Sequence, residues 1–219
     1  MIKGIVFDFD GVLADSEPLH LRAYQDILTP RGVTLSRDDY YATYLGFDDQ
    51  GVFRQLAEDR GWSIGEREVA ALIDEKGRAF DRLVRNTDVL YPGAARCVER
   101  MAAAFPLGIA SGALEHEIRG ILERGGLDRH FRFIVASGHT PVSKPAPDPY
   151  RLAARLHGLE PSACLAIEDS QQGVESAKSA GLACIALTHT YPAEALAAAD
   201  RVVASLDDLT PDLVRSLAR

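Results

Sequence analysis

Two aspartates separated by one residue, Asp8 and Asp10, are the first side chains whose spacing suggests chemistry. They stand at the end of an apolar run at 4–9 that has the composition of a β-strand. Because alternate side chains of an extended backbone point to the same face, the two carboxylates lie close together. Like charges so near to each other repel unless a cation or a shared proton offsets the repulsion. With Mg²⁺ bound, one aspartate can attack phosphorus while the other transfers protons.

Polar residues also follow three later apolar runs, at 107–110, 133–136 and 164–167. In an open parallel sheet, ligands bind outside the carboxyl ends of the strands, so residues that follow different strands meet there. A lysine and a serine hydroxyl suit phosphate oxygens, further carboxylates suit Mg²⁺, and glycine lets backbone N–H groups approach an anion. Each motif alone also fits a turn or a helix cap, but their joint occurrence favours one binding site. The residues are Ser111, Gly112, Lys144, Glu168 and Asp169.

Two patterns alternate over most of the chain. Apolar runs predict β-strands at 4–9, 107–110, 133–136, 164–167, 184–187 and 201–204. Helical spacing predicts helices at 94–104, 114–123, 149–157, 173–180 and 206–217. Strands that alternate with helices indicate βαβ units and a parallel sheet, and strands that are apolar throughout are covered on both faces. The fold class is therefore α/β.

The region 15–86 departs from this alternation, because it contains helical patterns and no convincing strand. Helices are expected at 17–28, 49–60 and 66–84. The simplest organisation is an α/β core, residues 1–14 and 87–219, that is interrupted after its first strand by an all-helical cap at 15–86.

Composition and charge exclude several classes of protein. The 219 residues include 32 acidic and 24 basic side chains, a net charge of −8, which argues against a nucleic-acid or anionic-membrane binder. No apolar run approaches the ~20 residues that a bilayer requires, and Asp8 and Asp10 interrupt the only N-terminal run that resembles a signal peptide. The spacing of Cys97, Cys164 and Cys184 fits neither a disulfide framework nor a zinc site. We therefore expect a cytoplasmic protein without nucleic-acid or membrane partners, and a monomer because no apolar stripe is left unused.

Taken together, four segments resemble the haloacid dehalogenase (HAD) superfamily of phosphotransferases. They are Asp-Phe-Asp-Gly-Val-Leu-Ala-Asp-Ser at 8–16, Ser111, Lys-Pro-Ala-Pro-Asp-Pro at 144–149, and Glu-Asp-Ser-Gln-Gln-Gly-Val at 168–174. The resemblance spans nearly the whole chain and implies a Rossmann-like core. The helical insertion resembles the cap of the branch that contains β-phosphoglucomutase and the phosphoglycolate-phosphatase-like enzymes.

This resemblance implies a role for each matching residue. Asp8 would form a phospho-aspartate and bind Mg²⁺, while Asp10 would act as general acid and then general base, with its backbone carbonyl on the metal. Asp169 would be a metal ligand, and Glu168 either a ligand or an acceptor behind the ligands. Phosphate binding would fall to Ser111, Gly112 and Lys144. The dehalogenases of the family resemble this pattern less, so Asp10 argues against dehalogenation.

Phosphatases and phosphomutases share these residues, and the cap helps to distinguish them. The mutase cap carries a Gly-x-Ser-Arg loop whose arginine grips a second phosphate. The comparable stretch here is Gly-Phe-Asp-Asp-Gln at 46–50, in which an aspartate at the arginine position would repel a distal phosphate. We therefore expect a Mg²⁺-dependent phosphatase that acts on a small phosphorylated metabolite. The alternatives are a sugar phosphomutase and a non-catalytic phospho-aspartate switch.

Several cap residues are candidates for contacting the substrate. His20 lies in a stretch that resembles the family's hinge, and Lys76 lies where related caps often carry a lysine. Asp48 and Asp49 are candidates for binding a polar or cationic part of the substrate. Each also has a structural interpretation: a helix-surface histidine, a solvated lysine, and two acids that stabilise the start of a helix.

Overall fold

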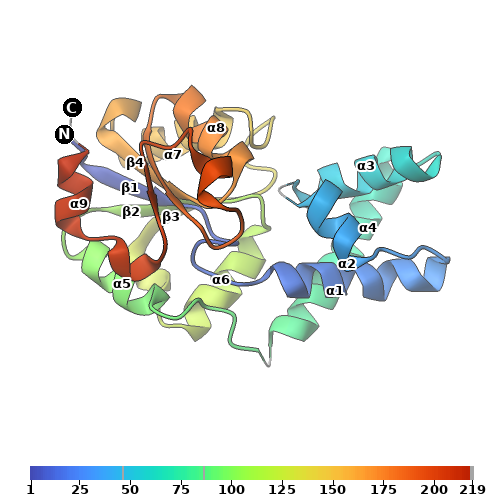
Figure 1. Cartoon of the computed structure of the whole chain (residues 1–219). Helices are drawn as coiled ribbons and strands as arrows, with labels where there is room; N and C mark the ends of the chain where they lie inside the picture. The colour runs from blue at the N-terminus through green and yellow to red at the C-terminus, as the bar shows by residue number, and fades with distance from the viewer. Residues whose placement is uncertain (46, 86, 218–219) are drawn as a thin grey trace. The chain divides into compact units, whose positions relative to one another are not determined.

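The computed structural model describes residues 1–45, 47–85 and 87–217. The chain forms two units, one from Met1–Asp15 with Leu90–Arg219 and the other from Ser16–Val89. The first contains the strands and the second is helical (Figure 1). Gly46, in the loop compared with the mutases, lies outside the described residues.

A six-stranded sheet in the order β3-β2-β1-β4-β5-β6 forms the centre of the first unit. All of its pairs are parallel, which confirms the predicted α/β class. β1 lies between β2 and β4, so the strand order reverses beside β1, and ligands bind at such a switch point. The strands are β1 Gly4–Phe7, β2 Leu107–Ala110, β3 Phe131–Val135, β4 Cys164–Glu168, β5 Ala183–Leu187 and β6 Arg201–Val203.

Helices cover both faces of this sheet, with α7 and α8 on one face and α5 and α6 on the other (Figure 1). This arrangement explains why the central strands are apolar on both sides, since β1, β2 and β4 are buried along their whole length. The helices are α5 Ala94–Ala102, α6 Glu115–Arg124, α7 Asp148–His157, α8 Gln171–Ala180 and α9 Pro211–Ser216.

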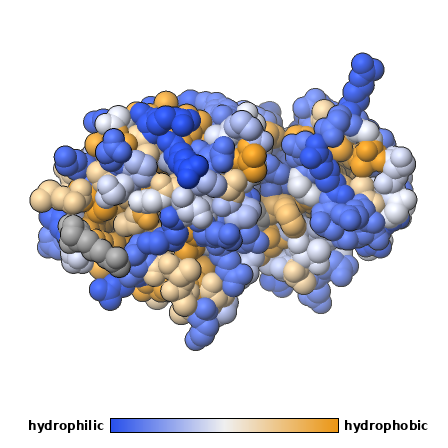
Figure 2. Space-filling view, turned by 90° about the horizontal axis from the view of Figure 1, so that it is seen from above, coloured by the Kyte–Doolittle hydropathy of each residue, from blue (hydrophilic) through white to orange (hydrophobic). Residues whose placement is uncertain are grey.

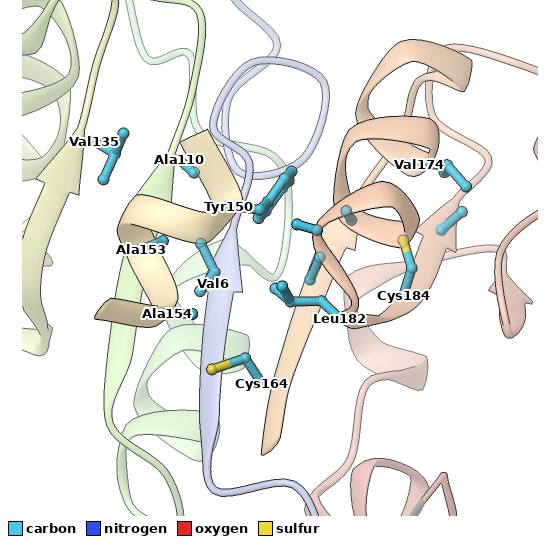
Figure 3. Close-up of a cluster of buried hydrophobic side chains, with 14 of the residues drawn as sticks. Val6, Ala110, Val135, Tyr150, Ala153, Ala154, Cys164, Val174, Leu182 and Cys184 are labelled. Carbon is cyan, nitrogen blue, oxygen red and sulfur yellow. The ribbon is translucent and has the colours of Figure 1, made fainter. Parts of the chain in front are cut away.

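Small apolar side chains let α7 pack closely on the sheet (Figure 3). Tyr150 and Ala153 of α7 lie against Val6 of β1 and Ala110 of β2, and all four are 0% exposed. Full burial of an aliphatic side chain such as valine stabilises the fold by about 1.5–3 kcal/mol. The same packing holds the ring of Tyr150 in one place, which fixes the position of its hydroxyl group.

Most expected elements are confirmed within a few residues, but the last helix is not. The strand at 107–110 and the helices at 17–28, 49–60 and 66–84 have the expected bounds. The expectation of one helix over 206–217 was wrong, because a 3₁₀ turn at Leu206–Asp208 precedes the separate helix α9. Thr210 caps α9 through its hydroxyl oxygen, and Pro211 has no N–H with which to continue a preceding helix.

The second unit is built from helices, which are α1 Glu17–Leu28, α2 Arg37–Asp39, α3 Asp49–Arg60 and α4 Glu66–Val84. The three long ones, α1, α3 and α4, each bury one face. α1 packs against α4, with Tyr24 of α1 and Phe80 of α4 among the buried side chains. The Asp48 carboxylate accepts a hydrogen bond from the Gly51 N–H at 2.8 Å and so begins α3.

Polar and charged side chains cover much of the face seen in Figure 2, with apolar residues between them. In the described part of the chain, the large apolar side chains with high exposure are Met1, Phe47, Val142 and Leu156, which belong to different segments. None of the described helices combines the length and the apolar character that a membrane span requires.

Candidate functional site

The carboxyl ends of the central strands bring together the polar residues that the sequence singled out. Asp8 directly follows β1, and its N–H donates to Ile167 O of β4 at 2.8 Å. Ser111 directly follows β2, and its N–H donates to Val135 O of β3 at 2.9 Å. Glu168 is the last residue of β4. These backbone hydrogen bonds place the side chains at one edge of the sheet, as predicted.

The turn after β1 positions Asp8 and Asp10 through a glycine. Gly11 has a φ of +77°, and its N–H donates to Ala14 O at 2.8 Å. A Cβ at this position would lie 1.9 Å from Asp169 Oδ2. Both the backbone conformation and the close approach of Asp169 therefore require glycine here. Asp10, one residue earlier, is partly exposed.

Lys144 provides the positive charge of the site. Its Nζ lies 2.9 Å from Asp8 Oδ1 and 2.6 Å from Glu168 Oε1, and its side chain is 11% exposed. One ammonium group therefore forms ion pairs with carboxylates at the ends of two different strands. The sequence predicted this meeting of Asp8, Glu168 and Lys144, although the residues are far apart in the chain.

Glu168 is fully enclosed, and the protein contacts both of its carboxylate oxygens. Oε1 accepts hydrogen bonds from Lys144 Nζ and from the Tyr150 hydroxyl at 2.7 Å. Oε2 accepts from the Asp169 N–H at 3.1 Å and from the Ser170 hydroxyl at 3.2 Å. A Cβ on Gly173 would lie 1.9 Å from the Glu168 carboxyl carbon, so helix α8 approaches this group as closely as a glycine permits.

Negative charge exceeds positive charge among these buried groups. Burial raises the pKa of Asp8 to about 7, and the charges of Glu168 and Asp10 add to the shift while Lys144 opposes it. Burial and the charges of Asp8 and Glu168 raise the pKa of Asp169 well above its usual value. Burial lowers the pKa of Lys144, but its two carboxylate partners outweigh that effect and raise it. The site therefore favours a further positive charge.

The residues present fit a magnesium ion. Asp8, Glu168 and Asp169 are all buried, and each offers a carboxylate oxygen within 4.8 Å of the others. Hard oxygen ligands of this kind suit Mg²⁺, which is bound by few carboxylates and keeps several waters. Because both Glu168 oxygens already accept hydrogen bonds from the protein, Asp8 and Asp169 are the better placed ligands.

The structure adds residues to the site that the sequence reasoning missed. The Tyr150 hydroxyl contacts Glu168 Oε1, and the Thr190 hydroxyl donates to Asp169 Oδ2. His189 Nδ1 lies 2.9 Å from Gly11 O. Thr190 and His189 follow β5 at the same edge of the sheet, so the strand-end argument, extended to this strand, points to them. Tyr150 carries no such signal, because it lies within a helix.

The candidate cap residues form a polar cluster inside the helical unit. Lys76 is 0% exposed, and its Nζ lies 3.0 Å from Asp49 Oδ1 and 2.7 Å from His20 Nδ1. The Tyr24 hydroxyl also donates to Asp49 Oδ1, at 2.6 Å. The interpretations of Lys76 as solvated and of His20 as a surface residue were wrong, because the aromatic residues of α1 and α4 enclose both. His20 stacks on Phe80 with ring centroids 4.1 Å apart.

Asp48 and Asp49 differ in what they contact. Asp48 caps helix α3, as the structural interpretation expected. Asp49 is the ion-pair partner of Lys76, and within the described part of the chain no hydrogen bond reaches its buried Oδ2. A contact between the cap residues and a substrate stays a prediction.

Comparisons with known proteins agree with this fold. The family model for haloacid dehalogenase-like hydrolases matches residues 2–181. A phosphoglycolate phosphatase of Yersinia pestis is 28% identical over 218 residues, 96% of this chain and 92% of that protein. A mutant of CbbY from Rhodobacter sphaeroides, solved in complex with xylulose 1,5-bisphosphate, is 28% identical, with a TM-score of 0.86 over 95% of this chain and 96% of that one. The fold is also that of β-phosphoglucomutase from Clostridium difficile, which is 22% identical with a TM-score of 0.87 over 99% of this chain and 96% of that one.

Magnesium is expected to raise the melting temperature more at about pH 8 than at about pH 5. Between the usual pKa of 3.8 and the raised value of about 7 at Asp8, the folded ion-free protein holds protons that the unfolded chain has released. Its stability therefore falls as pH rises through this window. A divalent cation replaces those protons, so its effect is largest above the window. Thermal unfolding with and without MgCl₂, with NaCl at matched ionic strength as control, measures the difference. Equal gains at both pH values would contradict the expectation.

Replacing Gly173 with alanine is expected to lower the free energy of unfolding by ~1–3 kcal/mol, because overpacking forces helix α8 or Glu168 to move. The matched control is Gly120→Ala in α6, where the nearest atom to the added Cβ is 3.6 Å away. That variant should be stabilised by ~0.5–1 kcal/mol through the better helix propensity of alanine. Urea unfolding of both variants distinguishes the two cases, and similar values for the two would refute the close approach at Gly173.

Proposed function

Since this chain belongs to the haloacid dehalogenase-like hydrolases, we propose that it is a Mg²⁺-dependent phosphatase that hydrolyses a small phosphorylated metabolite through an aspartyl-phosphate intermediate. The observation that carries the proposal is the position of Asp8. Its carboxylate lies at the end of β1, paired with Lys144 at 2.9 Å and grouped with Asp169. A nucleophile, a cation for phosphate oxygens and oxygen ligands for a metal are thus combined in one place.

Asp8 is the nucleophile in this proposal. One of its carboxylate oxygens forms a bond to phosphorus while the bond from phosphorus to the ester oxygen of the substrate breaks. The ion pair with Lys144 favours the ionised form of Asp8, which burial alone would disfavour. When bound by Asp8 and Asp169, Mg²⁺ supplies positive charge that offsets the charge of the attacking carboxylate and of the phosphate.

Asp10 transfers the protons. It lies two residues after Asp8 and is partly exposed. Both features suit a group that donates a proton to the leaving oxygen of the substrate. In the second step a water molecule attacks phosphorus, Asp10 takes the proton of that water, and the bond between phosphorus and Asp8 breaks to release phosphate. The carboxylate of Asp8 and the proton on Asp10 are thereby regenerated, so the cycle balances.

Ser111 and Lys144 hold the transferring phosphoryl group. The Ser111 Oγ accepts a hydrogen bond from the Ala113 N–H at 3.1 Å, which leaves the hydroxyl hydrogen to donate to a phosphate oxygen. Gly112 lies between Ser111 and Ala113, and its lack of a side chain lets an anion approach the backbone there. Glu168 acts through Lys144, since it fixes the ammonium group beside Asp8.

Hydrolysis is favoured over phosphomutase chemistry by the charges of the cap. A second phosphate on an intermediate needs a cation to hold it, yet the buried Lys76 is already paired with Asp49. The similarity to a phosphoglycolate phosphatase supports the same direction, and membership of a hydrolase family argues against a non-catalytic switch. The buried free cysteines, Cys97, Cys164 and Cys184, support the proposed cytoplasmic location.

Asp8→Asn is expected to abolish Mg²⁺-dependent release of phosphate while the protein stays folded. The substitution removes the nucleophilic oxygen but keeps the size of the side chain. The measurement is phosphate release from sugar phosphates, phosphoglycolate and xylulose 1,5-bisphosphate, with Mg²⁺ and with EDTA, together with the melting temperature of each variant. Asp128→Asn, the same change at an exposed position of the core, serves as the control with unchanged rates.

Mass spectrometry of the acid-quenched reaction tests the intermediate separately. A phosphoryl group on the peptide that contains Asp8, present in the wild type and absent in Asp8→Asn, is the expected result. Residual turnover of Asp8→Asn comparable to that of the wild type would remove Asp8 from the role of nucleophile. Activity that persists in EDTA would remove the metal from the proposal.

A further inference from the structure

We propose that His189 and Thr190, the residues that follow Thr188 after β5, are positioning residues of the phosphoryl-transfer site. Thr190 sets the orientation of the Asp169 carboxylate, and His189 holds the carbonyl group of Gly11, the residue that follows Asp10. The inference rests on the proposed function of Asp10 and Asp169. It assigns a third segment of the core, beyond the ends of β1 and β4, to the support of the metal ligands and of the acid-base residue.

The register of the sheet brings this segment to the site. β5 runs parallel to β4 with Ala186 opposite Glu168, so the residues just after β5 lie beside the residue just after β4. The Thr188 N–H donates to Val203 O of β6 at 3.1 Å and anchors the start of the segment. Thr190 is therefore carried on a backbone that the sheet itself holds in place.

Thr190 contacts Asp169 through its hydroxyl group, which donates to Asp169 Oδ2. The same oxygen is enclosed on another side by Gly11, because a Cβ on Gly11 would lie 1.9 Å from Asp169 Oδ2 and 2.8 Å from Thr190 Oγ1. A carboxylate held by a hydrogen bond and by close packing has little freedom to rotate. Such partners of metal ligands orient the ligand, and their loss typically weakens metal binding by ~10–100-fold.

His189 contacts Gly11 as well, at its carbonyl group. Its Nδ1 lies 2.9 Å from Gly11 O, and because a carbonyl oxygen only accepts, Nδ1 carries the hydrogen. The imidazole ring packs on Tyr91, with ring centroids 4.2 Å apart. Gly11 is thus held at its carbonyl by His189 and at its N–H by Ala14 O. The Gly11 N–H is part of the peptide bond that joins Gly11 to Asp10, and the Gly11 carbonyl is part of the next one. Holding both groups fixes Gly11 and so limits how the backbone and carboxylate of Asp10 can move.

Thr190→Val tests the first contact, because valine keeps the shape of threonine and removes the hydroxyl. The expected result is a ~10-fold or larger increase in the Kd for Mg²⁺, obtained from the rise of the melting temperature with Mg²⁺ concentration. Thr190→Ser, which keeps the hydroxyl, should stay within ~3-fold of the wild type by the same reasoning. Thr188→Val is the matched control and should titrate like the wild type.

The Mg²⁺ titration separates positioning from simple stability. A structural role alone would lower the melting temperature of ion-free Thr190→Val and leave its Kd for Mg²⁺ unchanged, and that result would overturn the proposal. If Thr190→Val does not fold, Thr190→Ala removes the same hydroxyl without the branched methyl group and is read in the same way. The readout does not require a known substrate, so it stands even if no phosphatase activity is found.

His189→Leu and His189→Asn test the second contact by kinetics with the best substrate of the panel. Asparagine can donate from its side-chain amide at the position of Nδ1, whereas leucine cannot. His189→Leu should lower kcat by ~10-fold with little change in KM, the pattern of a loss confined to the transition state. His189→Asn should recover most of kcat. Equal loss in both variants, or a change in KM alone, would refute the role of His189. Absence of turnover in the wild type would instead count against the proposed function.

Discussion

The interaction on which the site depends is the contact of one ammonium group, that of Lys144, with the carboxylates of Asp8 and Glu168. Charges that are removed from water are costly unless each meets a partner of opposite sign and enough hydrogen-bond donors. Glu168, which is 0% exposed, meets this requirement through Lys144, the Tyr150 hydroxyl and donors at the start of α8. The remaining negative charge, on Asp8 and Asp169, is what the proposed Mg²⁺ would offset. Structural support and chemical function are therefore linked, because Lys144 both stabilises the buried Glu168 and opposes the rise that burial causes in the pKa of the proposed nucleophile, Asp8.

The second constraint on the site is the close approach of the backbone to the carboxylates of Asp169 and Glu168. Two glycines, Gly11 and Gly173, stand where a Cβ would lie within 2 Å of an acidic side chain. They allow the turn after β1 and the first turn of α8 to close around Asp169 and Glu168, so that these carboxylates meet defined donors rather than bulk water. The parallel sheet supplies the frame, because neighbouring strands in fixed register deliver their carboxyl ends to the same edge. β5 extends this frame to Thr190 and His189, which contact the site from beyond β4.

The helical unit shows the same principle away from the sheet. Lys76 lies among aromatic rings, with its Nζ 5.0 Å from the centroid of Phe80, and it is paired with Asp49 and His20. A buried lysine without such partners would be strongly destabilising. The pair leaves the cap without a spare cation at this position, which is why the proposed function favours a phosphatase over a mutase that must hold a second phosphate. Asp49 thus has two consequences. It forms a local ion pair with Lys76, and it places a negative charge where the mutase cap has a positively charged arginine.

The sequence by itself determined the alternation of strands and helices, the helical insertion, and most of the residues that follow the central strands. These features are encoded locally, since the period of apolar residues reports which faces are buried and a parallel sheet sends all its carboxyl ends to one edge. Only the tertiary structure decided which polar groups pair with one another. The contact of Tyr150 with Glu168, that of Thr190 with Asp169, and the burial of Lys76 beside Asp49 join residues that are 18, 21 and 27 positions apart. Their meeting depends on strand register and helix packing, which no local pattern specifies. The prediction of one helix over 206–217 was wrong for a local reason instead, because Thr210 and Pro211 start a new helix where apolar spacing alone predicted a continuous one.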